Sequence, residues 1–435
     1  MTAKLFTFAI LIISLTGVIR SQDGSADKRP LTPINLLERT ARVRTTANAR
    51  VQLADVQDIK NADVLRSGNV PNYIRAMRQH TKAASQYADL VQTVLFGGTV
   101  SPETKMAMGL RIAQTYNSPY LYAQANRWMR ASRSGREMLA DWVNRAAQPA
   151  AEKLAVDYAE RLTKDIHGVT DTDFAAVRSV YNDAQIVELT MTVCFFNHFV
   201  RLAEGLNLPV ETWVLDDKSP KMPEIEAFAN PKARIALVSD KEPDAGTSAL
   251  AAVKQAEAQA PQNGLGIGIA NSQRAMMRVP DFQAAWRNFG SQNRQSWSID
   301  RNIQLQISFA VSMANGCRYC TLHQVLGLRR LGVDTKKLLS MKKDDSALTP
   351  RELAAVVFAR KLTVDPASIS DNDFAGVKKE FGEGGAVEVI LQTGNFAFMN
   401  RFTDGLRLPS EDEAVKTYQE VYGDNTYKTD WKKPK

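Results

Sequence analysis

The chain has 435 residues, of which 44% are hydrophobic and 23% are charged, and its formal net charge is +8. This length leaves room for two or three domains, and the composition is ordinary for a soluble globular protein. Basic and acidic residues are interleaved, with no basic stripe carrying aromatics, so no nucleic-acid partner is expected. Three cysteines are too few for a disulfide scaffold.

Residues 1–21 read as a signal peptide. Lys4 gives the positive start, and residues 5–19 form an apolar run that is short for a membrane span of about 20 residues. Cleavage is expected after Ser21. We therefore expect an exported protein, periplasmic or secreted. An uncleaved N-terminal membrane anchor is the alternative.

Helical patterns dominate the rest of the chain. Residues 22–65 are a polar N-terminal extension, and beyond them apolar residues recur at spacings of three and four, as in "KLAVDYAERLTKDI". Threonine or serine and aspartate in "TDTDF" and "SDNDF" suit helix starts, because their side chains accept from free backbone N–H groups. Alternating patterns typical of strands are rare and short. We predict an all-α protein.

The helical pattern occurs twice. Residues 156–177 align without gaps to 356–377, and residues 188–209 align to 388–409. A constant separation over two long matches predicts an internal duplication into two tandem domains. The predicted organisation is a first repeat at 66–212, an Ala/Gly/Gln/Pro-rich linker at 213–270, a second repeat at 271–415 and a C-terminal tail at 416–435.

The second repeat contains the motif "NGCRYCTLH", with Cys317, Cys320 and His323. On a helix, residues three apart share one face. A cysteine in the first helical turn gains from the helix dipole, which lowers its thiol pKa, and a nearby histidine can hold the thiolate or relay a proton. The motif therefore offers a nucleophilic thiol, a resolving thiol and a base.

The motif has other interpretations. Thr321 follows the second cysteine, which excludes the C-x-x-C-H motif of c-type haem, and no βαβ pattern supports a thioredoxin fold. A structural disulfide closing so short a loop would constrain the unfolded chain little. Zinc needs four ligands and the motif offers three. The disulfide and zinc remain alternatives, the fourth zinc ligand then coming from Cys194, His80, His167 or His198.

The first repeat is expected to lack this chemistry. An alignment with a three-residue slip places residues 111–135 opposite residues 308–332. In it Tyr120, Ala123 and Asn126 stand opposite the two cysteines and the histidine. The first repeat would then keep the fold without the thiols, as a structural or substrate-shaping half.

The cysteine motif, together with the downstream "FARKLTVDPASISDNDFAGVKKEF" and "AVEVILQTGNFAFMNRF", resembles the carboxymuconolactone decarboxylase-like superfamily, and within it the AhpD-like, peroxidase-related branch. The resemblance covers about 275–412 and, more weakly, 66–212. It implies all-α domains, homo-oligomers and thiol peroxidase activity without a bound cofactor or metal. Cys320 would attack a hydroperoxide, Cys317 would resolve the product to a disulfide, His323 would relay protons, and an external dithiol would reduce the pair.

The sequence departs from the AhpD-like pattern at two positions. The family histidine stands four residues after the second cysteine, where this chain has Gln324, with His323 one position earlier. The family glutamate stands twelve residues before the first cysteine, where this chain has Leu305. Both departures leave the rate and the natural substrate open. The possible pocket residues are Tyr319, Gln304, Asn400 and Arg401.

Several polar or reactive residues have ordinary structural interpretations. Cys194 and His198 lie on an apolar helix and are expected in the core. Glu188 and Glu388 occupy equivalent places in the two repeats, where an ion pair or a helix start explains them as well as catalysis. The alternative for the whole protein is a non-catalytic binding or interaction protein that keeps the fold and a structural disulfide.

Overall fold

The computed structural model describes five stretches of the chain, residues 49–54, 70–77, 79–131, 149–214 and 270–423. The regular elements in these stretches are all helices, so the predicted all-α class is confirmed. The predicted signal peptide lies outside the described residues. So do most of the N-terminal extension, most of the linker and the end of the tail.

The described helices fall into two groups along the chain. The first group comprises α2 (Asn72–Arg75), α3 (Thr81–Phe96), α4 (Pro102–Tyr116), α5 (Pro119–Ala131), α7 (Ala150–Lys164), α8 (Asp171–Arg178), α9 (Asp183–Gly205) and the 3₁₀ turn η2 (Thr212–Val214). The second group comprises α11 (Asn271–Met276), α12 (Pro280–Trp286), the π-helical η3 (Arg287–Gln292), η4 (Asn293–Ser296), α13 (Arg301–Asn315), α14 (Arg318–Arg330), α15 (Thr335–Lys343), α16 (Pro350–Val364), η5 (Pro366–Ser368), α17 (Asp371–Gly405) and α18 (Asp412–Tyr422).

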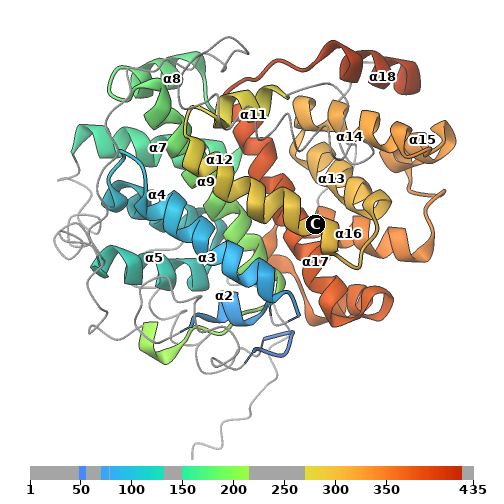
Figure 1. Ribbon diagram of the computed structural model, residues 1–435, viewed down its shortest axis with the longest axis horizontal. Helices are drawn as coiled ribbons and strands as arrows, with labels where there is room; N and C mark the ends of the chain where they lie inside the picture. Colours follow the sequence, from blue (N-terminus) through green and yellow to red (C-terminus); the bar gives the residue numbers. More distant parts are fainter. Residues whose placement is uncertain (1–48, 55–69, 78, 132–148, 215–269, 424–435) are drawn as a thin grey trace, which may run out of the picture.

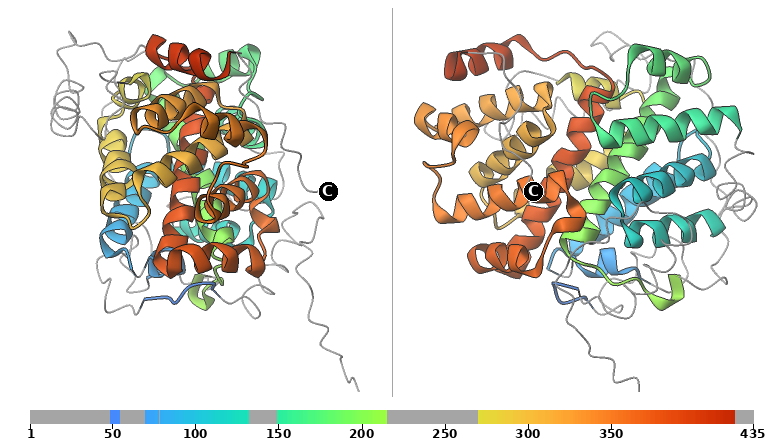
Figure 2. Two further views of the ribbon diagram at one scale, coloured as in Figure 1. Left: turned by 90° about the vertical axis from the view of Figure 1, so that its right-hand side faces the viewer. Right: turned by 180° about the vertical axis from the view of Figure 1, so that it is seen from behind.

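Helices α9 and α17 pack against each other at the centre of the molecule. Figures 1 and 2 show α4, α5 and α7 on one side of this pair and α13 to α16 on the other. Small residues allow the close approach: Gly205 faces Ile390, and Gly394 faces the ring of His198. Helix α9 is also the one described helix long and apolar enough to span a membrane, and its apolar window is completely buried here.

Two helix starts follow the expected capping chemistry. Thr170 accepts a hydrogen bond from the backbone of Asp173 at the start of α8, and Asp173 bonds back to the backbone N–H of Thr170. Ser370 and Asp373 form the same reciprocal pair at the start of α17. Each pair satisfies two backbone donors that a helix start would otherwise leave free. The helix starts predicted from "TDTDF" and "SDNDF" are therefore confirmed.

Helix α17 is two helical segments joined at Gly382, which has φ 70° and ψ −179°. A positive φ of this kind strains any residue with a Cβ, so glycine permits the break. In the first group a complete break separates α8 from α9 near the equivalent position, where Asn182 caps α9. The second segment of α17 therefore corresponds in place to α9.

The order of helices in the two groups recurs. Helices α4 and α5 start at Pro102 and Pro119, and α13 and α14 start 199 positions later in each case, at Arg301 and Arg318. Helices α9 and α17 end 200 positions apart, both at a glycine. The starts and ends of these helices thus have nearly the same separation as the two sequence matches, and the duplication stays a prediction.

Two apolar clusters hold the described part of the fold together. The larger one includes side chains from both groups of helices and contains Cys317, Tyr319 and Cys320. The smaller one joins α13, α14, α15 and α18, and includes Leu322, Val325 and Tyr418. Helix α14 therefore has one face in each cluster, which holds its first turn in place.

The predicted tail needs a correction at its beginning. Residues 416–422 belong to α18, and Tyr418 and Val421 are buried in the smaller apolar cluster. An amphipathic helix of this kind is stabilised when its apolar stripe packs against other helices. In the sequence, polar and charged residues separate these apolar positions, so the stripe is hard to recognise. As a result of this packing, Glu411, the residue that precedes α18, is held against α14.

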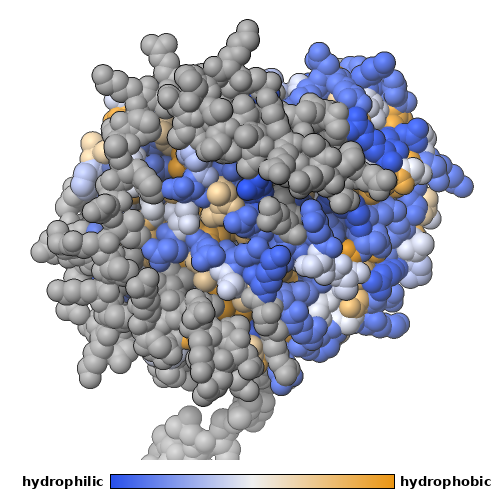
Figure 3. Space-filling model, in the orientation of Figure 1, coloured by the Kyte–Doolittle hydropathy of each residue, from blue (hydrophilic) through white to orange (hydrophobic). Residues whose placement is uncertain are grey.

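The face of the second group of helices that Figure 3 shows is mainly hydrophilic. In Figure 3 apolar side chains are scattered among polar ones over α13 to α16. Among the described residues, the exposed large apolar side chains are Val180, Leu331, Leu339, Leu353 and Val357.

Candidate active site

The cysteine motif begins at the junction of two helices. Gly316 ends α13 with a left-handed backbone, φ 74°, and the N–H of Cys317 then bonds to the carbonyl of Ser312 at 2.8 Å. This arrangement satisfies the last carbonyls of α13 and turns the chain sharply. Cys317 is therefore the N-cap of α14, and its Sγ accepts a hydrogen bond from the backbone N–H of Cys320 at 3.3 Å.

Both sulfur atoms contact one hydroxyl group on α17. The Sγ atoms of Cys317 and Cys320 each lie 3.4 Å from Oγ1 of Thr403. Cys317 is 0% exposed and Cys320 is 3% exposed, and both are free thiols. The spacing of three residues thus places the two thiols on one face at the start of a helix, as predicted.

The environment of Cys317 differs from the sequence expectation in one respect. Burial raises the pKa of its thiol well above the usual range, and the adjacent Cys320 sulfur and the Asp404 carboxylate act in the same direction. The helix N-terminus favours a thiolate, but at this position the loss of solvation outweighs it. Cys317 is therefore held as the neutral thiol.

His323 is buried on α14, three residues after Cys320, and both of its ring nitrogens are engaged. Its Nδ1 lies 2.6 Å from the carbonyl oxygen of Tyr319, and its Nε2 lies 2.7 Å from Oε2 of Glu411. The ring of Tyr319 stacks on the imidazole, with the centroids 4.2 Å apart. The orientation of the imidazole is therefore set by these contacts rather than by a hydrogen bond to a sulfur.

Glu411 is the functional candidate that the sequence reasoning missed. It is the N-cap residue of α18, and its other carboxylate oxygen, Oε1, accepts from the hydroxyl of Tyr319 at 3.2 Å. Its position 88 residues after the histidine left no spacing signal. Only the packing of α18 on α14 brings the carboxylate to His323.

The contacts fix where protons must be. A carbonyl oxygen only accepts hydrogen bonds, so Nδ1 of His323 carries a hydrogen that it donates to Tyr319. A further proton must lie between Nε2 and Glu411, because a 2.7 Å contact between two bare acceptors would be repulsive. The pair therefore holds an exchangeable proton within the buried site.

The departure from the AhpD-like pattern at the expected glutamate position has a packing explanation. Leu305, which stands at that position, is buried in the smaller apolar cluster together with Phe309 and Met313. A carboxylate there would lose its solvation without a partner. Glu411 instead supplies a carboxylate from a different helix.

The predicted pocket residues divide into two groups. Tyr319 contacts His323 and Glu411 and so lies in the site. The amide of Gln304 donates to the carbonyls of Arg294 and Ile299, which anchors the turn before α13.

Asn400 is also engaged structurally. It accepts from Asn315 at 2.8 Å and donates to Ser312 at 3.1 Å, linking α17 to α13. These contacts bind helices together one turn from Thr403 and account for both ends of the amide.

Arg401 joins the two groups of helices. Its Nη2 donates to the hydroxyl of Tyr116 at 2.8 Å and to the carbonyl of Thr163 at 3.0 Å. Arg201 makes the equivalent bonds, to Tyr116 at 3.2 Å and to the carbonyl of Thr363 at 2.8 Å. The two guanidiniums thus bind the C-terminal turns of α7 and α16, which explains why both repeats carry the arginine.

The first group of helices contains the same polar frame with different chemistry. The hydroxyl of Tyr120 and the amide of Gln124 donate to Glu211, at 2.9 and 3.1 Å, just as Tyr319 and His323 contact Glu411. Ser118 accepts from the N–H of Leu121 at 3.3 Å, as Cys317 does from Cys320.

These contacts correct the predicted alignment of the first repeat. Ser118, Leu121 and Gln124 occupy the places of the two cysteines and the histidine, and Tyr120, Ala123 and Asn126 do not. The slip arose because few identities mark this segment, whereas the helix ends and caps define it in three dimensions. Neither thiol has a counterpart in the first group.

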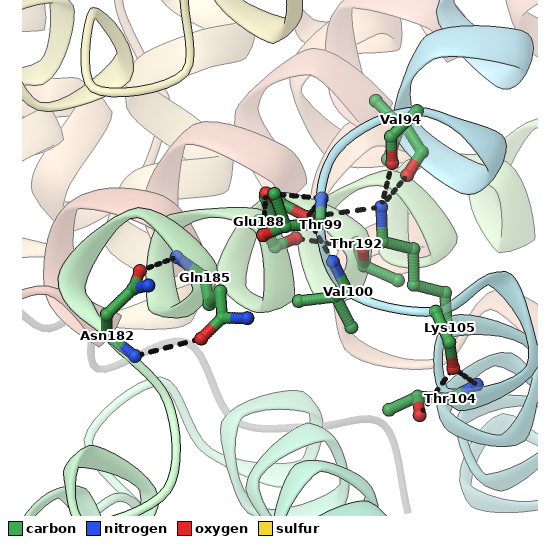
Figure 4. A network of polar contacts seen from close by, with 11 residues as sticks. Val94, Thr99, Val100, Thr104, Lys105, Asn182, Gln185, Glu188 and Thr192 are labelled. Atoms are coloured by element: carbon green, nitrogen blue, oxygen red, sulfur yellow. Dashed lines mark hydrogen bonds and ion pairs between the residues drawn. The ribbon is translucent and has the colours of Figure 1, made fainter. Parts of the chain in front are cut away.

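Glu188 and Glu388 cap backbone turns. Glu188 accepts from the backbone N–H groups of Thr99 and Val100 at 2.9 Å, and the buried Lys105 lies 3.5 Å away (Figure 4). Glu388 accepts from Ser298 and Ile299 in the same manner. Because the same role is filled in both groups of helices, these carboxylates are structural.

The remaining reactive groups lie in the core. Cys194 and His198 are fully buried, and Nδ1 of His198 lies 3.1 Å from the hydroxyl of Tyr87. Burial raises the pKa of the Cys194 thiol. Within the part of the chain that the structure describes, no group of three or more His, Cys, Asp or Glu side chains is arranged to hold a metal ion.

One comparison with known proteins agrees with the family resemblance expected from the motif. The family model "Carboxymuconolactone decarboxylase family" matches residues 280–361, which run from α12 into α16 and include the cysteine pair. No curated protein matches the chain. Among solved structures, the debrominase Bmp8 is similar in two forms. The variant in complex with 2,3,4-tribromopyrrole is 19% identical, with a TM-score of 0.38, and covers 43% of this chain and 96% of its own.

The apo form of Bmp8 is 20% identical, with a TM-score of 0.37, and covers 43% of this chain and 97% of its own.

The family match falls on the second group of helices and confirms the resemblance stated from the motif there. Residues 280–361, which hold the two thiols and His323, are thus similar to the carboxymuconolactone decarboxylase family.

Proposed function

We propose that this protein is a thiol oxidoreductase that reduces hydroperoxides through Cys320 and Cys317. The observation that carries the proposal is the arrangement of two free thiols in the first turn of α14, next to a buried His323–Glu411 pair. A nucleophilic thiol, a resolving thiol and a proton carrier are what this reaction requires.

In the proposed reaction, the thiolate of Cys320 attacks the terminal oxygen of a hydroperoxide. The O–O bond breaks, the sulfur becomes a sulfenic acid, and the peroxide leaves as an alcohol after taking up a proton. The Cys317 sulfur then attacks the sulfenic sulfur, the S–O bond breaks, and water and a disulfide form. An external dithiol reduces this disulfide by two exchange steps and leaves as its own disulfide.

The two cysteines differ in ways that support this division of roles. Cys320 is the more exposed of the two, at 3% against 0%. Burial raises the pKa of Cys317, which keeps it protonated while the other sulfur reacts. A thiol that stays neutral until a sulfenic acid forms beside it is suited to resolve that acid.

The His323–Glu411 pair supplies proton transfer in the proposal. Its shared proton lies one helical turn from Cys320, because His323 follows that cysteine by three residues on α14. The pair also substitutes for the family carboxylate that is lost at Leu305. We propose that protons released by the thiols and taken up by the leaving groups pass through it.

For partners and location, we propose what the sequence predicts. The protein needs no resident cofactor, and it works as an exported homo-oligomer that draws electrons from an external dithiol. In an oxidising compartment the pair would return to the disulfide unless that reductant is supplied.

The burial of the two thiols favours one alternative to the proposed function. Thiols that are at most 3% exposed, one of them with a raised pKa, also suit a non-catalytic binding protein in which the pair serves as a structural disulfide. The two functions predict different redox behaviour. A structural disulfide has a potential below about −300 mV and stays oxidised in mild reductant, whereas a catalytic one is reduced readily.

The deciding experiment is dithiol-dependent hydroperoxide consumption. Wild type, Cys320→Ser and Cys317→Ser are compared, with Thr393→Val as a control for a buried side chain of α17 whose hydroxyl donates to the carbonyl of Val389. We expect consumption by wild type and the control and none above background by Cys320→Ser. Equal rates for wild type and Cys320→Ser would exclude the proposed function.

A further inference from the structure

Thr403 connects the two thiols through a single oxygen atom. Its Oγ1 lies 3.4 Å from both sulfurs, and its side chain is fully buried in α17. The same hydroxyl lies 3.0 Å from the carbonyl oxygen of Met399 in the preceding turn. It also lies 3.4 Å from the carbonyl oxygen of Asn400, so four groups surround one hydroxyl.

The protonation of the two sulfurs decides which neighbour of the Thr403 hydroxyl accepts its hydrogen bond. A threonine hydroxyl donates one hydrogen bond and accepts two. With both cysteines protonated, it donates to Met399 and accepts from the two S–H groups. When one sulfur becomes a thiolate, that sulfur stops donating and offers a charged acceptor, so the hydroxyl hydrogen has a stronger partner than Met399.

The first group of helices shows what this position holds without thiols. Ala203 stands on α9 at the place that Thr403 has on α17, two residues before the terminal glycine of each helix. Ser118 and Leu121 stand at the places of the cysteines. The hydroxyl is therefore present in the half with two thiols and absent in the half without them, while the surrounding tyrosine and glutamate occur in both.

We propose that Thr403 is a catalytic residue of the thiol site, whose hydroxyl rotates from Met399 to donate a hydrogen bond to the Cys320 thiolate. The inference rests on the proposed function for its role in turnover. This change needs no movement of the backbone or of Oγ1, because the hydroxyl hydrogen turns about the Cβ–Oγ1 bond while the oxygen stays 3.4 Å from the sulfur. The carbonyl of Met399 keeps its ordinary helical backbone bond when the hydroxyl leaves.

The same helix supplies a matched control for the ordinary role of a helical threonine. Thr393 is also fully buried in α17, and its hydroxyl donates to the carbonyl of Val389 at 2.8 Å. This is the ordinary contact of a helical threonine, whose hydroxyl donates a hydrogen bond to the carbonyl of the preceding turn. Replacing Thr393 by valine removes such a bond without touching a thiol.

The test is the alkylation of Cys320 by iodoacetamide in the fully reduced protein, followed by peptide mass mapping from pH 5 to pH 10. We expect Thr403→Val to slow alkylation at pH 7 about fivefold to tenfold and to move the pH profile upward, because the thiolate loses a charge-assisted hydrogen bond. Thr403→Ser and Thr393→Val should follow the wild-type profile. A wild-type profile for Thr403→Val overturns the inference.

A second variant covers the case in which valine disturbs folding. Thr403→Ala installs the residue that the first group of helices carries at this place, and thermal unfolding of both variants is recorded beside alkylation. An upward profile in the folded variant, whichever it is, supports the inference. A wild-type profile in that variant overturns it.

Alkylation requires no peroxide, so the two proposals fail separately. If wild type consumes no hydroperoxide but the Thr403 variants alkylate slowly, the proposed function is wrong and the role of the hydroxyl on the thiolate stands. If wild type consumes hydroperoxide and the Thr403 variants alkylate at its rate, the function stands and this inference is wrong.

Discussion

The Oε2 atom of Glu411 lies 2.7 Å from Nε2 of His323, so the N-cap residue of α18 supplies the carboxylate that faces the histidine of the cysteine motif. Oε1 of the same carboxylate accepts from the hydroxyl of Tyr319. One side chain therefore fixes the imidazole and the ring stacked on it. The proposed proton transfer depends on this contact between α14 and α18.

Replacing Glu411 by glutamine tests that dependence. Glutamine keeps the size and the hydrogen-bonding reach of the side chain but cannot share a proton with the imidazole. We expect dithiol-dependent peroxide consumption to fall by about tenfold or more, in the range for loss of a general acid–base group, and its pH profile to change shape. Initial rates from pH 5 to pH 9 measure both effects.

Glu413→Gln is the control for Glu411→Gln. Glu413 lies two residues further along on α18, where it pairs with Arg330 at the surface. Because an exposed ion pair contributes little to stability, this variant should keep the wild-type rate and pH profile. A Glu411→Gln variant with an unchanged profile would show that the carboxylate only holds the helix.

The buried thiol of Cys317 should react slowly at neutral pH. Burial raises its pKa well above the usual range, and only the thiolate is the nucleophile. In Cys320→Ser, we expect alkylation at Cys317 to keep rising in rate beyond pH 9. Unfolding the same variant in urea should bring the midpoint back toward about 8.5, the value of an ordinary cysteine. The same midpoint in both states would contradict the assigned burial effect.

Acid should destabilise the protein through His198. Burial lowers the pKa of this histidine to about 3, with the Arg201 guanidinium acting in the same direction. The unfolded histidine titrates near 6.5, so between about pH 6.5 and pH 3 the unfolded state binds a proton that the folded state does not. Stability from the neutral imidazole is complete above that window and falls as the pH drops, by about 3 kcal/mol at pH 4.

Urea unfolding at pH 7 and pH 4 measures this effect of acid. His198→Asn keeps a polar group near Tyr87 and removes the titration. The variant should therefore lose about 3 kcal/mol less stability than wild type between the two pH values. If both proteins lose the same amount, the carboxylates alone account for the acid sensitivity.

The contact between α9 and α17 should be sensitive to a single methyl group. A Cβ added at Gly394 would lie 2.8 Å from Cδ2 of His198, closer than side-chain carbons approach. We expect Gly394→Ala to destabilise the protein by about 1–3 kcal/mol, as overpacking of a core does. Differential scanning calorimetry measures the loss as a lower melting temperature.

Gly376 on the same helix provides the matched comparison. A Cβ there would meet no atom within 4 Å. Gly376→Ala should be neutral or stabilise by about 0.5–1 kcal/mol, because alanine restricts the unfolded chain and suits a helix. Equal melting temperatures for the two alanine variants would mean that the central helices have room to separate.

Much of the fold could be read from local patterns. The capping residues at Thr170 and Ser370 start helices as expected, because such contacts join side chains three residues apart. Helix α18 was missed beyond residue 415, since its stability comes from packing on α14 and α15 rather than from its own sequence. The predicted alignment at Ser118 was wrong for a similar reason. The starts of α5 and α14 are recognised as equivalent by their capping hydrogen bonds, which the sequence does not show.

The sequence by itself determined the helical class, the family resemblance of residues 280–361 and the placement of Cys317, Cys320 and His323 at the start of one helix. These features depend on residues close together in the chain, whose relative positions a helix dictates. The tertiary structure alone decided that Thr403 and Glu411 join them. Those contacts bridge more than 80 residues, and packing between helices, which no local spacing encodes, brings them together.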